Sequence, residues 1–155
     1  MNPRPTGFLG LSHLGIISSI GWASLGSRVV AVDLDREAVD RLHRGELLVH
    51  EPSLPELFTA TRDRIHFSSD PAALAECDLV IVSRDIPTDA NDGSDPEIVH
   101  RLIEAAIPHL RPGSTLVLMS QVSPGATRAL WTTICHAVRN GRMPDAAWTK
   151  SRRSG

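Results

Sequence analysis

Short apolar runs alternate along the chain with longer segments in which apolar residues recur at the spacing of a helix face. The apolar runs predict strands over about residues 7–9, 28–32, 64–67, 79–82 and 115–119. The segments between them predict helices over about residues 14–25, 36–44, 54–60, 71–77, 97–109 and 126–138. Strands that alternate with helices in this way predict an α/β fold with a doubly wound parallel sheet.

The turn between the first strand and the first helix has a glycine pattern typical of dinucleotide binding. Gly10 lets the backbone turn tightly, and Gly15 lets the helix pack close to the strand. The middle position, where the backbone approaches a pyrophosphate most closely, is Ser12 rather than glycine. His13 and Leu14 begin the helix, whose free backbone N–H groups would face the pyrophosphate. The alternative is a glycine-containing turn of some other α/β protein.

An acidic residue ends the second predicted strand. Asp33 follows the glycine turn by about 20 residues, where an acid can hydrogen-bond an adenosine ribose and repel a 2′-phosphate. We therefore predict NAD as the cofactor of a Rossmann-like domain, with Arg36, at the start of the next helix, as a further candidate contact. Polar residues 83–94 follow the fourth strand, at the edge of the sheet where ligands bind, although they are also consistent with a surface connection.

Two local details give further expectations. Gly21 lies inside the first predicted helix, where glycine costs about 1 kcal/mol relative to alanine, and we interpret it as a site of close packing. Ser53 precedes the third predicted helix, with Pro55 in its first turn and Glu56 as its third residue, which predicts a capping box.

Composition narrows the class of protein. The 155 residues suffice for one domain, and a net charge of −2 gives no basic excess for nucleic-acid binding. No apolar run approaches the length that spans a bilayer, and the N-terminus lacks a secretory signal, so we expect no membrane partner. Cys77 and Cys135 form no C-x-x-C pair, which fits a reducing cytoplasm. The seven histidines lack ligand spacing, so we expect mostly surface histidines and no metal.

Several motifs in order resemble one family, the UDP-glucose/GDP-mannose dehydrogenases, which are NAD-dependent nucleotide-sugar 6-dehydrogenases. The resemblance covers about residues 7–128 and includes the glycine turn, the strand ending in Asp33, and the segment from Arg44-Gly45-Glu46 to Glu51-Pro52-Ser53-Leu54. It implies that Pro87 and Thr88 lie beside the cofactor, and that the loop beginning Ser120-Gln121 contacts its nicotinamide side.

The chain also departs from the pattern of that family. Ser12 and Ser53 replace glycines, Gln121 stands where threonine is common, and Arg84-Asp85-Ile86 replaces a small residue, glycine and threonine. A carboxylate at Asp85 would lie near the anionic cofactor and would weaken its binding. Beyond Arg128 the resemblance ends, and the family's sixth strand, catalytic lysine and cysteine, and sugar-nucleotide domain have no counterpart.

The resemblance implies oxidation of a primary alcohol to a carboxylate through a thiol-bound intermediate, which needs a thiolate, a base and a substrate pocket. Cys77 and Cys135 fall on neither the right element nor a site with an evident base, so we assign no catalytic residue and expect this chain alone to be inactive. We divide the chain into an NAD-binding domain, 1–139, that is incomplete at its C-terminal end, and a basic tail, 140–155, expected to be disordered.

Two functions remain open from the sequence. The chain is either the NAD-binding domain of a nucleotide-sugar 6-dehydrogenase that lacks its substrate domain, or a degenerate Rossmann module that acts in binding or protein interaction without a cofactor. An exposed apolar patch where the sixth strand should dock would predict self-association or a partner in the second case. A separate polypeptide that supplies the missing half is a third alternative.

Overall fold

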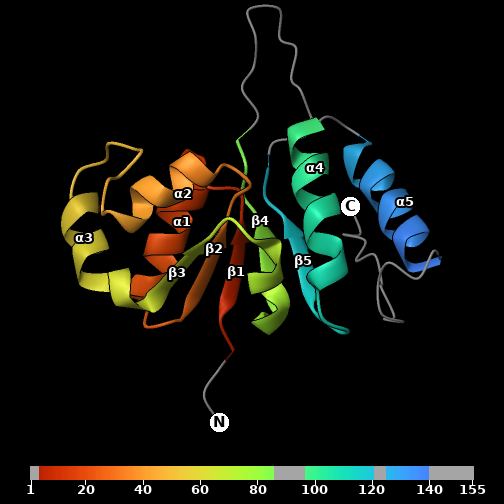
Figure 1. Cartoon of the computed structure of the whole chain (residues 1–155), viewed down its shortest axis with the longest axis horizontal. Helices are drawn as coiled ribbons and strands as arrows, with labels where there is room; N and C mark the ends of the chain where they lie inside the picture. The colour runs from red at the N-terminus through yellow and green to blue at the C-terminus, as the bar shows by residue number, and fades with distance from the viewer. Residues whose placement is uncertain (1–3, 86–96, 121–124, 140–155) are drawn as a thin grey trace, which may run out of the picture.

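A parallel sheet forms the centre of the computed structural model, which describes residues 4–85, 97–120 and 125–139 (Figure 1). Five strands lie in the order β3-β2-β1-β4-β5, and every neighbouring pair is parallel. The strands are β1 (Thr6–Leu9), β2 (Val29–Val32), β3 (Ile65–Ser68), β4 (Leu79–Val82) and β5 (Thr115–Leu118). The doubly wound parallel sheet predicted from the sequence is confirmed, and each predicted strand lies within two residues of its observed bounds.

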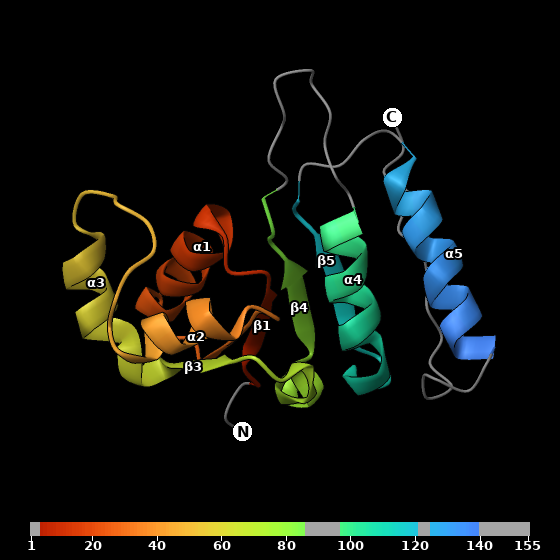
Figure 2. The same ribbon diagram turned by 45° about the horizontal axis from the view of Figure 1, so that its top comes forward.

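Helices connect the strands and cover the sheet. The α-helices are α1 (His13–Ser24), α2 (Arg36–His43), α3 (Leu54–Thr61), α4 (Glu97–Ala106) and α5 (Ala126–Arg139). The 3₁₀ helices are η1 (Arg62–Arg64), η2 (Pro71–Glu76) and η3 (Ile107–His109). Figures 1 and 2 show α1, α2 and α3 grouped on one side of the sheet's centre, with α4 and α5 on the other.

Alternate side chains of the central strands enter two separate cores. Phe8 of β1 and Ile81 of β4 belong to the core that α1, α2 and α3 cover. Leu9 of β1, together with Val80 and Val82 of β4, belongs to the core formed with η2, α4, η3 and α5. A parallel strand that is buried on both faces has no polar side to show, which explains its continuous apolar sequence.

The connections reverse direction at the centre of the sheet. From β1 the chain proceeds outward to β2 and β3, and then crosses back to place β4 on the other side of β1. Leu9, the last residue of β1, aligns with Val32 of β2 and with Val82 of β4. The carboxyl ends of these three strands therefore meet at the switch point, where open α/β sheets bind their ligands.

Two local predictions are wrong. Ser53 has φ 63°, in the left-handed region, and its hydroxyl accepts no hydrogen bond from α3, so the predicted capping box with Glu56 is not formed. An N-cap normally has an extended backbone, which directs the side-chain oxygen to the first N–H groups of the helix. A Cβ on Gly21 would meet nothing within 4 Å, so this glycine is not a site of close packing.

Some predicted features lie outside the described residues. They are the basic tail 140–155 and most of the polar loop 83–94. No helix in the described part of the chain is long and apolar enough to cross a membrane. In the same residues, no group of three or more His, Cys, Asp and Glu side chains could hold a metal ion.

Candidate dinucleotide-binding site

The glycine turn brings β1 into α1 with little room for side chains. Gly10 has φ 98°, a conformation that favours glycine, and a Cβ on it would lie 2.7 Å from the Cβ of Arg84. A Cβ on Gly15 would lie 1.9 Å from the carbonyl oxygen of Gly10. Both positions therefore require glycine, for the tight turn and for the close approach of α1 to β1, as the sequence pattern predicts.

Ser12 links this turn to the segment that follows β4. It precedes α1 with an extended backbone, but its side chain makes no capping hydrogen bond to the helix. The Ser12 hydroxyl donates to the carbonyl oxygen of Ser83 at 3.1 Å and accepts from the backbone N–H of Asp85 at 2.7 Å. The Ser12 side chain therefore accepts no hydrogen bond from the N–H groups in the first turn of α1.

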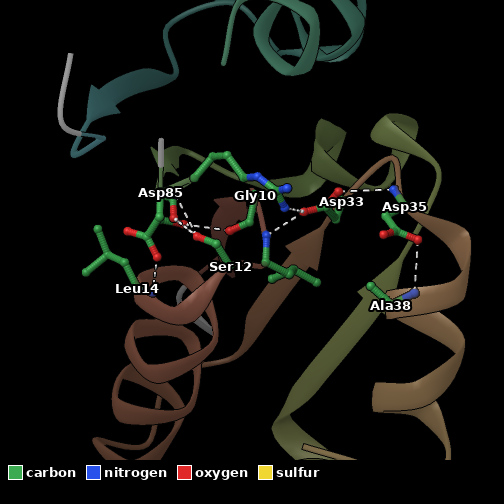
Figure 3. Close-up of polar contacts among 10 residues, drawn as sticks. Gly10, Ser12, Leu14, Asp33, Asp35, Ala38 and Asp85 are labelled. Atoms are coloured by element: carbon green, nitrogen blue, oxygen red, sulfur yellow. Dashed lines mark hydrogen bonds and ion pairs between the residues drawn. The ribbon is translucent and has the colours of Figure 1, made fainter. Parts of the chain in front are cut away.

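A carboxylate from outside the helix binds one of these N–H groups instead. Oδ2 of Asp85 accepts a hydrogen bond from the backbone N–H of Leu14 at 3.0 Å (Figure 3). The N-terminus of a helix attracts anions, because its free N–H groups and the helix dipole both favour negative charge there. Asp85 lies beside the turn, as the sequence leads us to expect, and its carboxylate is bound to one of the N–H groups that the sequence pattern assigns to a pyrophosphate.

Asp33 is the buried acid of the site. It is 4% exposed, and its carboxylate accepts hydrogen bonds from the backbone N–H groups of Leu11, at 2.7 Å, and Asp35, at 3.0 Å (Figure 3). It also forms an ion pair with Arg84, 3.2 Å from Nη1 to Oδ2. Asp33 thus stands where a ribose-binding acid is expected and also holds the glycine turn against the end of β2.

Arg84 is a site residue that the sequence reasoning did not select. Its side chain is 27% exposed, and its buried Nε has no hydrogen-bond partner in the described part of the chain. The available signal was its position, because Arg84 comes two residues after the end of β4, beside β1 at the switch point. From the sequence, Arg84 stands out only because the family pattern has a small residue at its position.

The other predicted residues are less tightly grouped. His13 has an exposed side chain whose Nε2 lies 2.9 Å from Oε1 of Glu51, in the segment before α3. Arg36 is exposed at the start of α2. Ser120 is buried just after β5, and its hydroxyl donates to the carbonyl oxygen of Val82 at 3.5 Å. Pro87, Thr88 and Gln121 lie outside the described residues.

The cysteines lie away from this site. Cys77 is fully buried just before β4, at the amino-terminal end of the strands. The glycine turn lies at their carboxyl-terminal end. Burial, with smaller contributions from Glu76 and Asp78, raises the pKa of its thiol to about 12, so it is not a thiolate nucleophile at neutral pH. Cys135 is half-buried on α5. The histidines are exposed apart from His100, which is half-buried, in agreement with the surface role expected for them.

The backbone frame fits a dinucleotide. Close approach at Gly10 and Gly15, the N-terminus of α1 and a buried acid at the end of β2 meet at one switch point. These are the groups that contact the pyrophosphate and ribose of NAD in a Rossmann domain. The side chains of Arg84 and Asp85 lie against the same groups.

Comparison with known proteins places this frame among nucleotide-sugar dehydrogenases. The chain is 29% identical over 143 residues to the UDP-N-acetyl-D-mannosamine dehydrogenase of Methanococcus maripaludis strain C7, a match covering 88% of this chain and 33% of that protein. It is 29% identical over 120 residues to the UDP-glucose 6-dehydrogenase of Pseudomonas aeruginosa, covering 76% of this chain and 26% of that protein. The chain thus spans about a third of the length of these curated relatives.

Solved structures agree with the sequence comparison. A UDP-glucose dehydrogenase from Pyrobaculum islandicum superposes with a TM-score of 0.76 at 26% identity, covering 86% of this chain and 32% of that one. The family model described as the UDP-glucose/GDP-mannose dehydrogenase family, NAD binding domain, matches residues 6–147. The chain therefore belongs to the UDP-glucose/GDP-mannose dehydrogenase family and corresponds to its NAD-binding domain, whose cofactor is NAD.

Proposed function

We propose that this chain is the cofactor-binding part of a nucleotide-sugar 6-dehydrogenase and that oxidation of the sugar requires a substrate domain in addition. The observation that carries the proposal is the meeting of the glycine turn and Asp33 at the switch point, since a Rossmann domain contacts its dinucleotide with groups of this kind. When bound, NAD supplies the acceptor for the hydride removed from the alcohol. In the described residues, neither Cys77 nor Cys135 lies where it could form a thiol-bound intermediate.

Each group of the frame has a separate task in this proposal. Gly10 allows the tight turn and Gly15 allows α1 to pack close to β1, and the N-terminus of α1 offers the Leu14 N–H to the pyrophosphate. Asp33 accepts hydrogen bonds from the ribose hydroxyls and opposes the 2′-phosphate of NADP by charge. Ser120, which follows β5 at the same edge of the sheet, is our candidate for the nicotinamide side.

The edge of the sheet at β5 supports a partner for this domain. β5 has β4 as its only strand neighbour in the described structure, and its residues alternate between exposed and half-buried. Val117 and Met119 are 38% and 42% exposed. We infer that a further strand and the substrate domain dock on this edge, because an uncovered apolar edge strand is prone to pair with another chain.

The free thiols of Cys77 and Cys135 support a cytoplasmic location.

Calorimetric titration of the chain with NAD and with NADP tests the cofactor assignment. We expect binding of NAD with discrimination against NADP. Asp33→Asn should weaken NAD binding and reduce the discrimination against NADP. The control Asp63→Asn makes the same charge change on exposed η1, at the amino-terminal end of the strands, and should bind NAD as the unmodified chain does. Unchanged affinity in a folded Asp33→Asn variant would count against the role of Asp33.

A second candidate function is favoured by the contact between Asp85 and the N–H of Leu14, since this carboxylate takes up part of the pyrophosphate site. In that case the chain is a Rossmann module that acts in protein interaction without a cofactor. Sedimentation velocity measures whether it self-associates. Self-association without binding of either nucleotide would support this candidate, and tight NAD binding by a monomeric chain would exclude it.

A further inference from the structure

We propose that Arg84 and Asp85 compete with NAD for the groups that bind it, so that the unmodified chain, called the parent below, binds NAD more weakly than it would without these two side chains. The inference rests on the proposed function, because it assigns a regulatory role to residues at that same site. It concerns side chains on the short segment Ser83–Asp85, which directly follows β4.

The position of Asp85 is fixed by buried contacts. Ser83 is fully buried, its N–H donates to the carbonyl oxygen of Leu9 at 2.9 Å, and its hydroxyl donates to the carbonyl oxygen of Gly10 at 3.1 Å. The Ser12 hydroxyl then accepts from the N–H of Asp85, which directs this residue toward α1 (Figure 3). These contacts hold the carboxylate over the Leu14 N–H, as a bound anion would be held.

Arg84 binds the carboxylate of Asp33, the group expected to bind the ribose. A carboxylate offers about four acceptor positions, and that of Asp33 already receives the N–H groups of Leu11 and Asp35 together with the guanidinium of Arg84. A ribose would have to share the remaining capacity or displace Arg84. The same cation also offsets the negative charge by which Asp33 would oppose a 2′-phosphate.

Together the two side chains imitate the polarity of the ligand. NAD offers an anionic pyrophosphate to the helix and hydrogen-bond donors to the buried acid. Asp85 offers a carboxylate to the helix, and Arg84 offers donors to Asp33. Because a ligand that needs a minor conformation binds more weakly in proportion to its population, this internal occupation lowers the apparent affinity for NAD.

Ser12 helps to hold Asp85 in place. At the middle position of the turn it supplies the hydroxyl that bonds both the Ser83 carbonyl oxygen and the Asp85 N–H. Glycine can adopt the extended backbone of Ser12, φ −77° and ψ −170°, and lacks the hydroxyl that makes this connection. Ser12→Gly is therefore a second way to release Asp85 without altering its charge.

The decisive experiment measures the dissociation constant of NAD by calorimetry for the full chain and its variants. Asp85→Asn should bind NAD about tenfold more tightly than the parent, equivalent to about 1.4 kcal/mol. Arg84→Gln and Ser12→Gly should each bind more tightly as well, and the Arg84→Gln/Asp85→Asn double variant most tightly. Asp63→Asn and Arg101→Gln repeat the charge changes at exposed residues of η1 and α4 and should leave the affinity within twofold of the parent.

Circular dichroism of each variant without NAD verifies that it is folded, and Ser12→Gly serves as the test if Asp85→Asn is not. If the parent binds NAD and folded Asp85→Asn and Ser12→Gly bind no more tightly, the internal competition is refuted while the proposed function stands. If neither the parent nor any folded variant binds NAD, both proposals are refuted.

Discussion

Replacing Asp33 with alanine should destabilise the domain, because this carboxylate joins the glycine turn to the second strand. The side chain is buried and accepts the N–H of Leu11, itself a residue only 3% exposed, at 2.7 Å. Alanine leaves this buried donor without its carboxylate partner, which costs about 1–3 kcal/mol. It also removes the acceptor of the Asp35 N–H and the counter-charge of Arg84. Because the Arg84 side chain is partly exposed, losing this ion pair adds about 1 kcal/mol or less to the destabilisation.

We therefore expect Asp33→Ala to lower the free energy of unfolding by about 1–4 kcal/mol. Urea unfolding measures this loss, and at a slope of about 2 kcal/mol/M the midpoint should fall by about 0.5–2 M. Tryptophan fluorescence is a suitable signal, since the ring of Trp22 on α1 lies against Phe8 of β1 at 6.1 Å between centroids. Most single domains have 5–15 kcal/mol to lose, so the variant should remain folded without denaturant.

Two further variants separate the contributions at this position. Asp33→Asn keeps one acceptor oxygen for the Leu11 N–H and should lose about half as much stability, which makes it the better variant for nucleotide titrations. Asp63→Ala removes an exposed acid and should change stability by less than about 0.5 kcal/mol. A loss below about 0.5 kcal/mol for Asp33→Ala, or an equal loss for Asp63→Ala, would refute the reasoning.

Three other predictions concern α1 and the cysteines. Gly21→Ala should raise the free energy of unfolding by about 0.5–1 kcal/mol in urea, because a Cβ there enters open space on a helix; a destabilised variant would contradict this. Iodoacetamide at neutral pH should modify half-buried Cys135 before buried Cys77, as followed by mass spectrometry, and rapid modification of Cys77 would contradict its burial. The pKa of the Cys77 thiol is about 12 in the native protein against 9.0 ordinarily, so stability should fall as the pH rises through that interval, where only the unfolded thiol ionises.

Local sequence predicted the elements well where one physical signal dominated. The run Leu79–Val82 is apolar throughout and forms β4, an interior strand in which Val80–Val82 are buried, because a strand with a helix layer on each face has no side turned to solvent. The helix predicted over residues 14–25 ends as α1 at Ser24, and Gly26 follows with φ 91°, in the left-handed region common after helix ends. These outcomes depend on backbone preference and burial, which neighbouring residues largely determine.

Prediction failed where the outcome depended on the path of the backbone. The residues of a capping box are present at Ser53 and Glu56, but a left-handed φ at Ser53 excludes the bond, and nothing in the motif specifies that angle. Gly21 appeared to mark a close approach, whereas it faces open space. A glycine shows only that a side chain is missing, and what surrounds it depends on helices distant in the sequence.

The sequence by itself determined the class of fold, the order of its elements and the family, because apolar periodicity and the glycine turn are local features of the chain. Only the tertiary structure decided what occupies the site. Asp85 is 71 residues from Leu14, and Arg84 is 51 residues from Asp33, and the parallel arrangement of β1, β2 and β4 brings them together. Hydrogen bonds and ion pairs act over a few ångströms in space, so their partners are decided by which strand ends become neighbours in the sheet.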